Sequence, residues 1–278
     1  MSKPVRMTRR VAFSSGHRYW ILAKTEGENR TIFGKWASPY NHGHNYILDV
    51  TVEGHVDPRT GMVVNIKRID DILKTRIVSQ FDGKSINDEI PAFFDRSSSL
   101  ENLISYICQT LTSPNVLPVE VRLTGLRLEE MPTLSAELDL DQDPTMMTLT
   151  RSYEFAASHR LDSPLLSHQE NLDLFGKCNN PAGHGHNYVL EVSVSGVPDA
   201  TSGMILNLTD LDEVVSELVV DRYDHKNLNV DIPEFQGRVT TSEVVALEIF
   251  SRLQSKLPGK LQRVRLHETA RNIFEVSI

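Results

Sequence analysis

The stretch from Phe175 to Tyr188, FGKCNNPAGHGHNY, gathers the residue types most able to do chemistry. His184 and His186 are two positions apart, and residues so spaced in a β-strand point to the same face of the sheet. Two imidazoles on one face can bind a single metal ion. Cys178 lies upstream, across a turn-forming run of Asn, Pro and Gly. If this loop folds back, the thiol lies near the metal, loses its proton readily and becomes a base or a nucleophile.

His159 offers a third imidazole at the end of the preceding strand-like run. Three neutral histidines leave one coordination position open, as at a catalytic zinc ion. Asp224 and His225 are adjacent, and a carboxylate that fixes the charge state of an imidazole can help it to shuttle protons. If the pair stood alone, a solvated loop with a helix cap would be the favoured interpretation. Glu268 is either an exposed strand end or a carboxylate that binds a guanidine-like ring edge.

The chain is a tandem repeat, because residues from about 7 to 140 recur from about 149 to 278. The offset is 142 over most of the repeat and 138 near its end, where Glu130 matches Glu268. An acidic, proline-containing junction separates the copies. We expect two copies of one domain, residues 1–142 and 143–278. The matched histidines are His17 with His159, His42 with His184 and His44 with His186.

The elements that must position these residues follow the same order in each copy. A strand ends at the first histidine, a long loop follows, and a second strand starts beside the other two. Two helices come next; Ser98 with Glu101, and Thr240 with Glu243, resemble capping boxes that open the second helix. Two strands close each copy. The order ββααββ indicates an α+β fold, with an antiparallel sheet and both helices on one face. The expected strands are 8–15, 45–53, 119–128 and 133–140, then 148–158, 187–195, 262–267 and 273–278.

Composition limits the classes of function. The 278 residues carry a net charge of −8, which argues against a general nucleic-acid binder. No run of about 20 apolar residues is present, so we expect no membrane span. The basic N-terminus leads into a strand pattern and not into an apolar signal core. Two cysteines make a disulfide framework improbable, and a reducing cytoplasm fits. Cys108, on the apolar face of a predicted helix, is typical of a small buried hydrophobe.

The second copy resembles the 6-pyruvoyl-tetrahydropterin synthase family. The segments ASHRL, LFGKCNNPAGHGHNY, SGMILNLTDL, YDHKNLN and TTSE occur in the order and spacing of that family. The five residues between Cys178 and His184 favour the biopterin-pathway enzyme over the carboxy-tetrahydropterin synthase, whose gap is typically shorter. One departure is Val244, where the family pattern has Asn.

This resemblance implies a T-fold and a reaction. The reaction is conversion of 7,8-dihydroneopterin triphosphate to 6-pyruvoyl-tetrahydropterin with loss of triphosphate, by a zinc-dependent lyase. The implied roles are zinc ligation by His159, His184 and His186, acid–base chemistry by Cys178, Asp224 and His225, and pterin binding by Glu268, with Thr241 and Glu243 near it. Single-copy relatives form stacked rings of three T-folds with active sites between subunits, which implies a trimer of this tandem chain, with six T-folds.

The first copy departs from the pattern at two reactive positions. Trp36 stands where the second copy has Cys178, and Gly83 stands where it has His225. Because His17, His42 and His44 remain, we expect this copy to bind a metal, with or without a pterin, but not to turn substrate over. The alternative is a purely structural half. For the whole chain, the alternatives are another dihydroneopterin-processing T-fold enzyme, such as the carboxy-tetrahydropterin synthase, or a metal- or pterin-binding scaffold.

Overall fold

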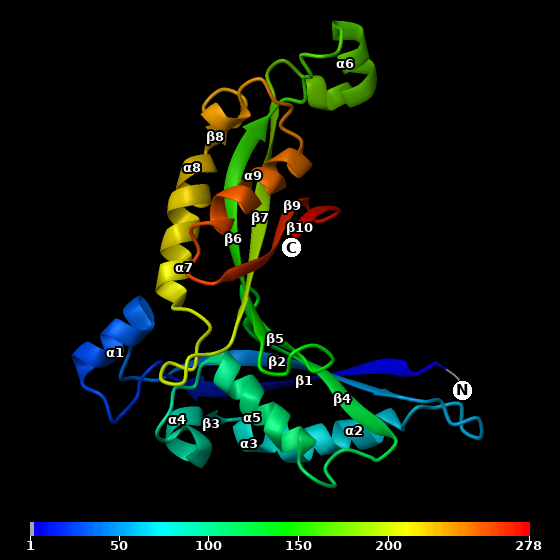
Figure 1. Cartoon of the computed structure of the whole chain (residues 1–278), viewed down its shortest axis with the longest axis vertical. Coiled ribbons are helices and arrows are strands. Elements are labelled where there is room, and N and C mark those ends of the chain that lie inside the picture. The colour runs from blue at the N-terminus through cyan, green and yellow to red at the C-terminus, as the bar shows by residue number, and fades with distance from the viewer. Residues whose placement is uncertain (1–2) are drawn as a thin grey trace. The chain divides into compact units, whose positions relative to one another are not determined.

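The computed structural model describes residues 3–278, which divide into two compact units. The first comprises the residues up to Leu149 together with Ser195–Thr209, and the second comprises Thr150–Val194 and Asp210–Ile278 (Figure 1). Among the described residues, no helix is long and apolar enough to cross a membrane.

The first unit contains an open sheet in the strand order β5-β4-β2-β1-β3. β1 and β2 pair antiparallel along their whole length, and the last pair in the register is His17 opposite His42. Apolar side chains alternate along β2, so that Leu48, Val50 and Val52 are fully buried. The strands are β1 (Val5–His17), β2 (His42–Gly54), β3 (Lys84–Ser85), β4 (Val121–Met131) and β5 (Leu134–Asp139).

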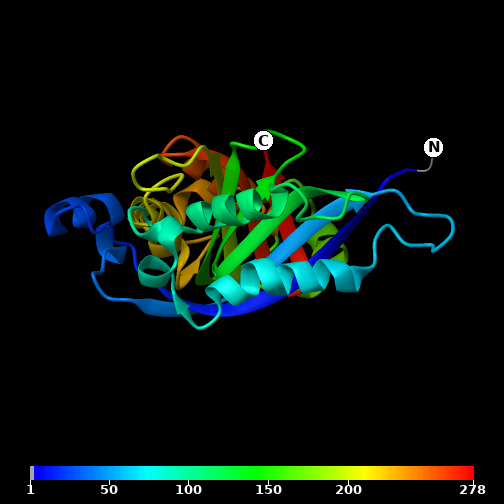
Figure 2. The same cartoon turned by 90° about the horizontal axis from the view of Figure 1, so that it is seen from below.

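The helices α2 and α5 lie on one face of this sheet (Figure 2). The first runs through a π-helical turn into α3, so one continuous helical segment spans 66–81. The predicted ββααββ order is present, with short elements added. The helical elements are α1 (Glu26–Phe33), η1 (Gly34–Trp36), α2 (Ile66–Leu73), η2 (Lys74–Val78), α3 (Ser79–Phe81), α4 (Ile86–Glu89), η3 (Pro91–Phe93) and α5 (Leu100–Thr112).

The second unit repeats this plan with strand order β10-β9-β7-β6, and β8 pairs with β6. Its strands are β6 (Met147–His159), β7 (His184–Gly196), β8 (Lys226–Asn227), β9 (Lys260–Thr269) and β10 (Asn272–Ser277). Its helical elements are α6 (His168–Phe175), η4 (Gly176–Asn179), α7 (Leu208–Val215), η5 (Ser216–Val220), α8 (Asp221–Tyr223), η6 (Pro233–Phe235) and α9 (Ser242–Gln254). A mixed α+β fold is therefore present in both units. Neither set of described strands forms a closed barrel, so ring assembly stays a prediction.

Two details differ from the sequence prediction. The segment between the first two strands, predicted to be a loop, contains α1 in one copy and α6 in the other. Each of these helices starts at a true capping box, Thr25 with Glu28 and Ser167 with Glu170. The boxes predicted for α5 and α9 are absent: Ser99 caps α5 by accepting from the N–H of Asn102, and α9 has no side-chain cap.

Glu101 is not part of a capping box because its carboxylate binds elsewhere in the first unit. Its Oε1 accepts a hydrogen bond of 2.9 Å from the backbone N–H of Ile205. The Ser99 hydroxyl donates to the carbonyl of Gly203 at 2.7 Å, and the Asn207 amide donates to the carbonyl of Ile32 at 3.0 Å. The loop that follows β7 is thereby fixed on the N-terminus of α5.

Burial of Glu101 makes the stability of the first unit depend on pH. Burial raises the pKa of this carboxyl to about 7. The folded state therefore binds more protons than the unfolded state between pH 4.5 and 7, and stability falls as pH rises through that window. We expect Glu101→Gln, which keeps an acceptor for Ile205, to raise stability at pH 8 by up to about 3 kcal/mol and to change it little at pH 4.5. Denaturant unfolding at the two pH values measures this difference; equal stabilities at pH 8 contradict it.

Candidate active site

Three histidines of the second unit meet where β6 ends and β7 begins. The Nε2 atoms of His159 and His184 are 3.1 Å apart, and one nitrogen from each of His159, His184 and His186 lies within 4.8 Å of the others. The carbonyl of Thr240 lies 2.7 Å from Nδ1 of His159, which assigns the proton to Nδ1 and leaves Nε2 as an acceptor.

These residues fit a zinc ion. Burial lowers the pKa of His159 and of His186, so both imidazoles are neutral, as metal ligation requires. Among the described residues, Nε2 of His186 is buried without a hydrogen-bond partner. Zn–N bonds of about 2.0–2.1 Å in a tetrahedral site place two ligand nitrogens about 3.3 Å apart, close to the observed 3.1 Å.

Glu268 lies beside the histidines at the end of β9. Its Oε1 is 3.9 Å from Nε2 of His159 and 3.8 Å from Nε2 of His186. The hydroxyl of Ser242 donates to Oε1 at 2.7 Å, and the amide of Asn272 donates to Oε2 at 2.9 Å. Burial acts to raise the pKa of Glu268, but these two hydrogen bonds and the nearby imidazoles of His186 and His159 together leave the pKa lowered. The site therefore holds a fixed, partly exposed carboxylate.

Asp224 and His225 form a hydrogen-bonded pair at the end of α8. Nδ1 of His225 lies 2.7 Å from Oδ2 of Asp224, and Oδ1 accepts 2.7 Å from the N–H of Ala156. The hydrogen bond from the N–H of Ala156 is the main cause that lowers the pKa of Asp224, and the hydrogen bond with His225 lowers it further. The backbone of His225 is left-handed, with φ of 56°, a conformation that is uncommon for residues other than Gly. The turn thus holds the imidazole outward under local strain.

A hollow of about 490 Å³ has one residue from each group in its lining, whereas His159, His184, Glu268 and Asp224 do not line it. His186 lines it from β7, and His225 lines it from the turn before β8. Among the described residues, Cys178 is not part of this lining. The structure therefore brings the three histidines together with Glu268, and it separately pairs Asp224 with His225. The contacts described above link Cys178 to neither group.

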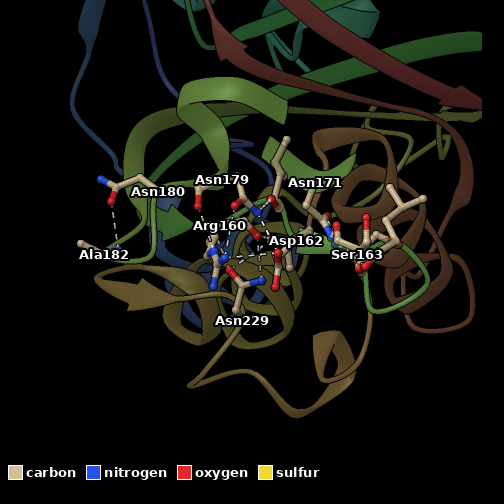
Figure 3. A network of polar contacts seen from close by, with 12 residues as sticks. Arg160, Asp162, Ser163, Asn171, Asn179, Asn180, Ala182 and Asn229 are labelled. Carbon is tan, nitrogen blue, oxygen red and sulfur yellow. Dashed lines mark hydrogen bonds and ion pairs between the residues drawn. The ribbon is translucent and has the colours of Figure 1, made fainter. Parts of the chain in front are cut away.

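A network of buried amides fixes the loop that carries Cys178 (Figure 3). The cysteine lies on η4, and its carbonyl accepts 2.9 Å from the N–H of Leu161. The next residue, Asn179, is 1% exposed; its amide donates to the carbonyl of Leu161 and to Asp162, both at 2.7 Å. Arg160 donates to the carbonyl of Asn179 at 3.1 Å. The thiol is thus presented from a rigid segment.

Replacement of Asn179 by alanine removes this anchor. We expect Asn179→Ala to lower the free energy of unfolding by about 1–3 kcal/mol, because buried partners lose their hydrogen bonds. We also expect lower activity from misplacement of the adjacent thiol. Asn180→Ala is the matched control, since Asn180 is exposed and makes only local bonds to Ala182 and Gly183. Equal stability of the two variants would show that the network does not fix the loop.

The first unit holds an equivalent triad. His17, His42 and His44 place one nitrogen each within 4.8 Å of the others. Burial lowers the pKa of His17 to about 3 and that of His44 to about 4, so these imidazoles are neutral. The carbonyl of Ser98, the residue that matches Thr240, lies 3.2 Å from Nδ1 of His17. His17 is therefore oriented in the same way as His159. These residues also fit a metal ion.

Aromatic side chains close the first-copy site. Tyr19, where the second copy has Leu161, is 1% exposed, and its hydroxyl donates to Glu130 at 3.5 Å. Its ring packs 5.3 Å from that of His17 and 6.3 Å from that of Trp36, the residue in the place of Cys178. The Glu130 side chain is 0% exposed, against 15% for Glu268. The matched carboxylate is therefore shielded from solvent.

The two copies also differ in what surrounds this carboxylate. Ser242 and Asn272, the donors to Glu268, are replaced by Leu100 and Leu134 in the first copy. Sequence analysis did not select Ser242, Asn272 or Asn179. All three lie near matched site residues, at positions where the second copy is polar and the first is apolar. A comparison of the two copies at such positions identifies them.

The turn that holds His225 is preserved around Gly83. The N–H of Gly83 donates to the carbonyl of Ser14 at 2.8 Å, as His225 donates to that of Ala156 at 2.6 Å. The φ angles are 70° and 56°. Asp82 accepts from the N–H of Ser14 at 2.9 Å, as Asp224 does from Ala156. Only the imidazole is missing.

Thr241 and Glu243 lie at the N-terminus of α9, on either side of Ser242. The Thr241 side chain makes no capping bond, and Glu243 is exposed. Neither side chain contacts Glu268 through a described hydrogen bond; Ser242 makes that contact instead.

Comparison with known proteins agrees with the repeat. A family model described as 6-pyruvoyl tetrahydropterin synthase matches residues 6–141 and again 148–277. The 6-pyruvoyl tetrahydrobiopterin synthase of Homo sapiens is 50% identical over 126 residues, which cover 45% of this chain and 87% of that protein. The enzyme of the same name from Drosophila melanogaster is 47% identical over 137 residues, 49% of this chain and 81% of that protein.

Similarity to a carboxy-tetrahydropterin synthase is lower. The 6-carboxy-5,6,7,8-tetrahydropterin synthase of Haemophilus influenzae is 27% identical over 150 residues, 47% of this chain and 98% of that protein. Among solved structures, the 6-pyruvoyl tetrahydropterin synthase of Caenorhabditis elegans is 43% identical, with a TM-score of 0.46, over 48% of this chain and 96% of its own. Because the family model matches nearly the whole chain in two segments, this chain belongs to the 6-pyruvoyl tetrahydropterin synthase family.

Proposed function

We propose that the chain converts 7,8-dihydroneopterin triphosphate to 6-pyruvoyl-tetrahydropterin and triphosphate, as a zinc-assisted lyase with its active site in the second copy. The observation that carries the proposal is the histidine triad with a fixed carboxylate beside it, and the Asp224–His225 pair of the same copy supports it. The relatives named above, at 47–50% identity, support this choice.

His159, His184 and His186 would hold the zinc ion, which when bound polarises the side-chain hydroxyls of the substrate and acidifies the neighbouring C–H bonds. Glu268, with Thr241 and Glu243 near it, would bind the pterin ring by accepting hydrogen bonds from its guanidine-like edge. Because Ser242 and Asn272 fix both carboxylate oxygens, the ring would enter in one orientation.

Cys178 would remove a proton from the substrate side chain, and the His225 imidazole, paired with Asp224, would exchange protons at the opposite side. The redox change is internal to the substrate, so no external oxidant is needed. In this chain the cysteine does not line the hollow with His225. We therefore propose that another chain of a homo-oligomer supplies one of the two groups, and that the copies 1–142 and 143–278 have different tasks.

The first copy would bind a metal through His17, His42 and His44 without turning substrate over. Loss of the thiol and the imidazole supports this, as does closure of the site by Tyr19 and Trp36.

Product analysis tests the proposal. Purified protein incubated with 7,8-dihydroneopterin triphosphate should release triphosphate and 6-pyruvoyl-tetrahydropterin, and prior treatment with a chelator should abolish both. Formation of a 6-carboxy product would instead identify a carboxy-tetrahydropterin synthase. Binding of the pterin without release of triphosphate would identify a scaffold.

A further inference from the structure

The carboxylate of Glu130 lies against the histidine triad of the first copy. Its Oε1 is 3.5 Å from Nε2 of His44, and its Oε2 is 3.8 Å from Nε2 of His17. Ligand atoms around one zinc ion in a tetrahedral site lie about 3.3–3.5 Å apart. Both Nε2 atoms are buried, and neither has a hydrogen-bond partner in the part of the chain that the structure describes. Each carboxylate oxygen therefore already faces a nitrogen that is able to bind a metal.

The matched carboxylate of the second copy is held differently. Oε1 of Glu268 lies 3.9 Å from Nε2 of His159 and 3.8 Å from Nε2 of His186. The same oxygen accepts the hydrogen bond of 2.7 Å from Ser242, and the other oxygen accepts from Asn272 at 2.9 Å. Two short hydrogen bonds thus hold this carboxylate beside the histidines as an acceptor for a bound ligand.

Apolar side chains replace both of these donors in the first copy. Leu100 and Leu134 stand at the matched positions, and each is 1% exposed. Tyr19 donates to Oε2 of Glu130 at 3.5 Å, which is longer than either hydrogen bond on Glu268. A fully buried carboxylate is costly unless hydrogen bonds or a positive charge compensate it. A metal ion shared with the histidines supplies that charge.

We propose, on the basis of the metal binding proposed above for the first copy, that Glu130 is a fourth protein ligand of that metal ion, together with His17, His42 and His44. The first copy then holds a structural metal site with no open coordination position. Three imidazoles and one carboxylate suit zinc or a similar divalent ion. His42 is exposed, which gives the ion a path into the site.

The carboxylates of the two copies therefore have different tasks. A catalytic zinc site keeps one coordination position open, whereas a structural site fills all four with protein ligands. In the first copy the carboxylate is committed to the metal and does not accept hydrogen bonds from a pterin ring. The four ligands lie on β1, β2 and β4, so the metal joins three strands of one sheet. It stabilises the folded first unit because it binds that state in preference to the unfolded chain.

Azide binding to Co²⁺ tests whether the first-copy site is closed. The full-length His184→Ala chain, loaded with Co²⁺, reports on the first copy, and His42→Ala reports on the second. Azide needs an open coordination position, so it should shift the visible absorption of the second-copy site and leave that of the first-copy site unchanged. A shift in the His184→Ala chain overturns the proposal.

A further substitution separates the carboxylate from the aromatic side chains that also close this site. Adding Glu130→Gln to His184→Ala should make the first-copy spectrum sensitive to azide, because the anion displaces a neutral amide. Tyr19 and Trp36 are unchanged in this variant, so they cannot be what excludes azide if the spectrum then shifts. An unchanged spectrum after Glu130→Gln overturns the proposal.

Metal affinity provides the second readout. Competition with a chromophoric chelator gives the dissociation constant of Zn²⁺ for each site in the same two chains. Glu130→Gln should weaken first-copy binding by more than the roughly 10–100-fold typical of losing an outer partner, because it removes a charged ligand. Glu268→Gln in the His42→Ala chain is the matched control and should weaken second-copy binding less. Equal losses of affinity in the two copies overturn the proposal.

Neither readout uses turnover, so the two proposals fail separately. Absence of the reaction in the wild type would contradict the proposed activity and leave the azide and chelator results as they are. A His184→Ala chain that binds no metal would overturn the fourth ligand and the metal binding of the first copy, without bearing on the reaction in the second.

Discussion

Cys178→Ala should lower turnover of 7,8-dihydroneopterin triphosphate by about 10²–10⁴-fold, the range by which a positioned proton-transfer group accelerates a reaction. Metal content and unfolding should change little, because Cys178 is only partly buried and lies outside the histidine triad. Steady-state kinetics with metal analysis measures both.

Cys108→Ala is the control for loss of a thiol as such. Cys108 lies on α5, where burial raises its pKa, so it lacks the character of a base at neutral pH. Its replacement should leave turnover unchanged. If Cys178→Ala retained activity within tenfold of the wild type, the thiol would not be the base, and a scaffold or another proton acceptor would be favoured.

His184→Ala and His42→Ala, two matched substitutions, should separate metal binding from turnover. Each removes one ligand from a three-histidine site, which should weaken that metal site by more than the 10–100-fold typical of losing an outer partner. We expect wild-type protein to contain two metal ions per chain and each variant to contain about one. Only His184→Ala should abolish turnover, since the first copy lacks the thiol and the imidazole.

Elemental analysis of purified chains, with activity measured on the same samples, distinguishes the outcomes. One metal ion per wild-type chain would remove metal binding from the first copy. Loss of activity in His42→Ala with unchanged unfolding would show instead that the first copy takes part in the reaction.

The sequence was sufficient to predict the ββααββ order and the meeting of the histidines, because strand spacing and the repeat constrain both. The alternation of side chains along β7 was enough to predict that His184 and His186 share a face, and the position of His159 at the end of β6 was enough to place it beside them. The predicted capping boxes at α5 and α9 were both wrong. At α5 the Ser98–Glu101 pattern is local, whereas Glu101 bonds to Ile205, distant in sequence. Local patterns do not reveal such long-range competition for a side chain.

The anchors of Glu268 were missed for a related reason. Ser242 and Asn272 are common surface residue types, and only the fold places both beside one carboxylate. The closure of the first-copy site by Tyr19 likewise depends on packing, which neither motif nor spacing encodes.

The preserved turn at Gly83 shows what kind of loss separates the two copies. Its left-handed backbone would accept a histidine again at a cost of about 1–2 kcal/mol, so a single substitution could restore the imidazole position. The remaining changes are interlocked, because Tyr19 and Trp36 pack together and Leu100 and Leu134 stand in the places of the donors to Glu268. Each reversal alone would open a cavity or bury an unpaired polar group. The proposed division of labour between the copies would therefore resist reversal by any single substitution. The backbone at Gly83 accepts a histidine, but the surrounding side chains do not allow the other changes to be made one at a time.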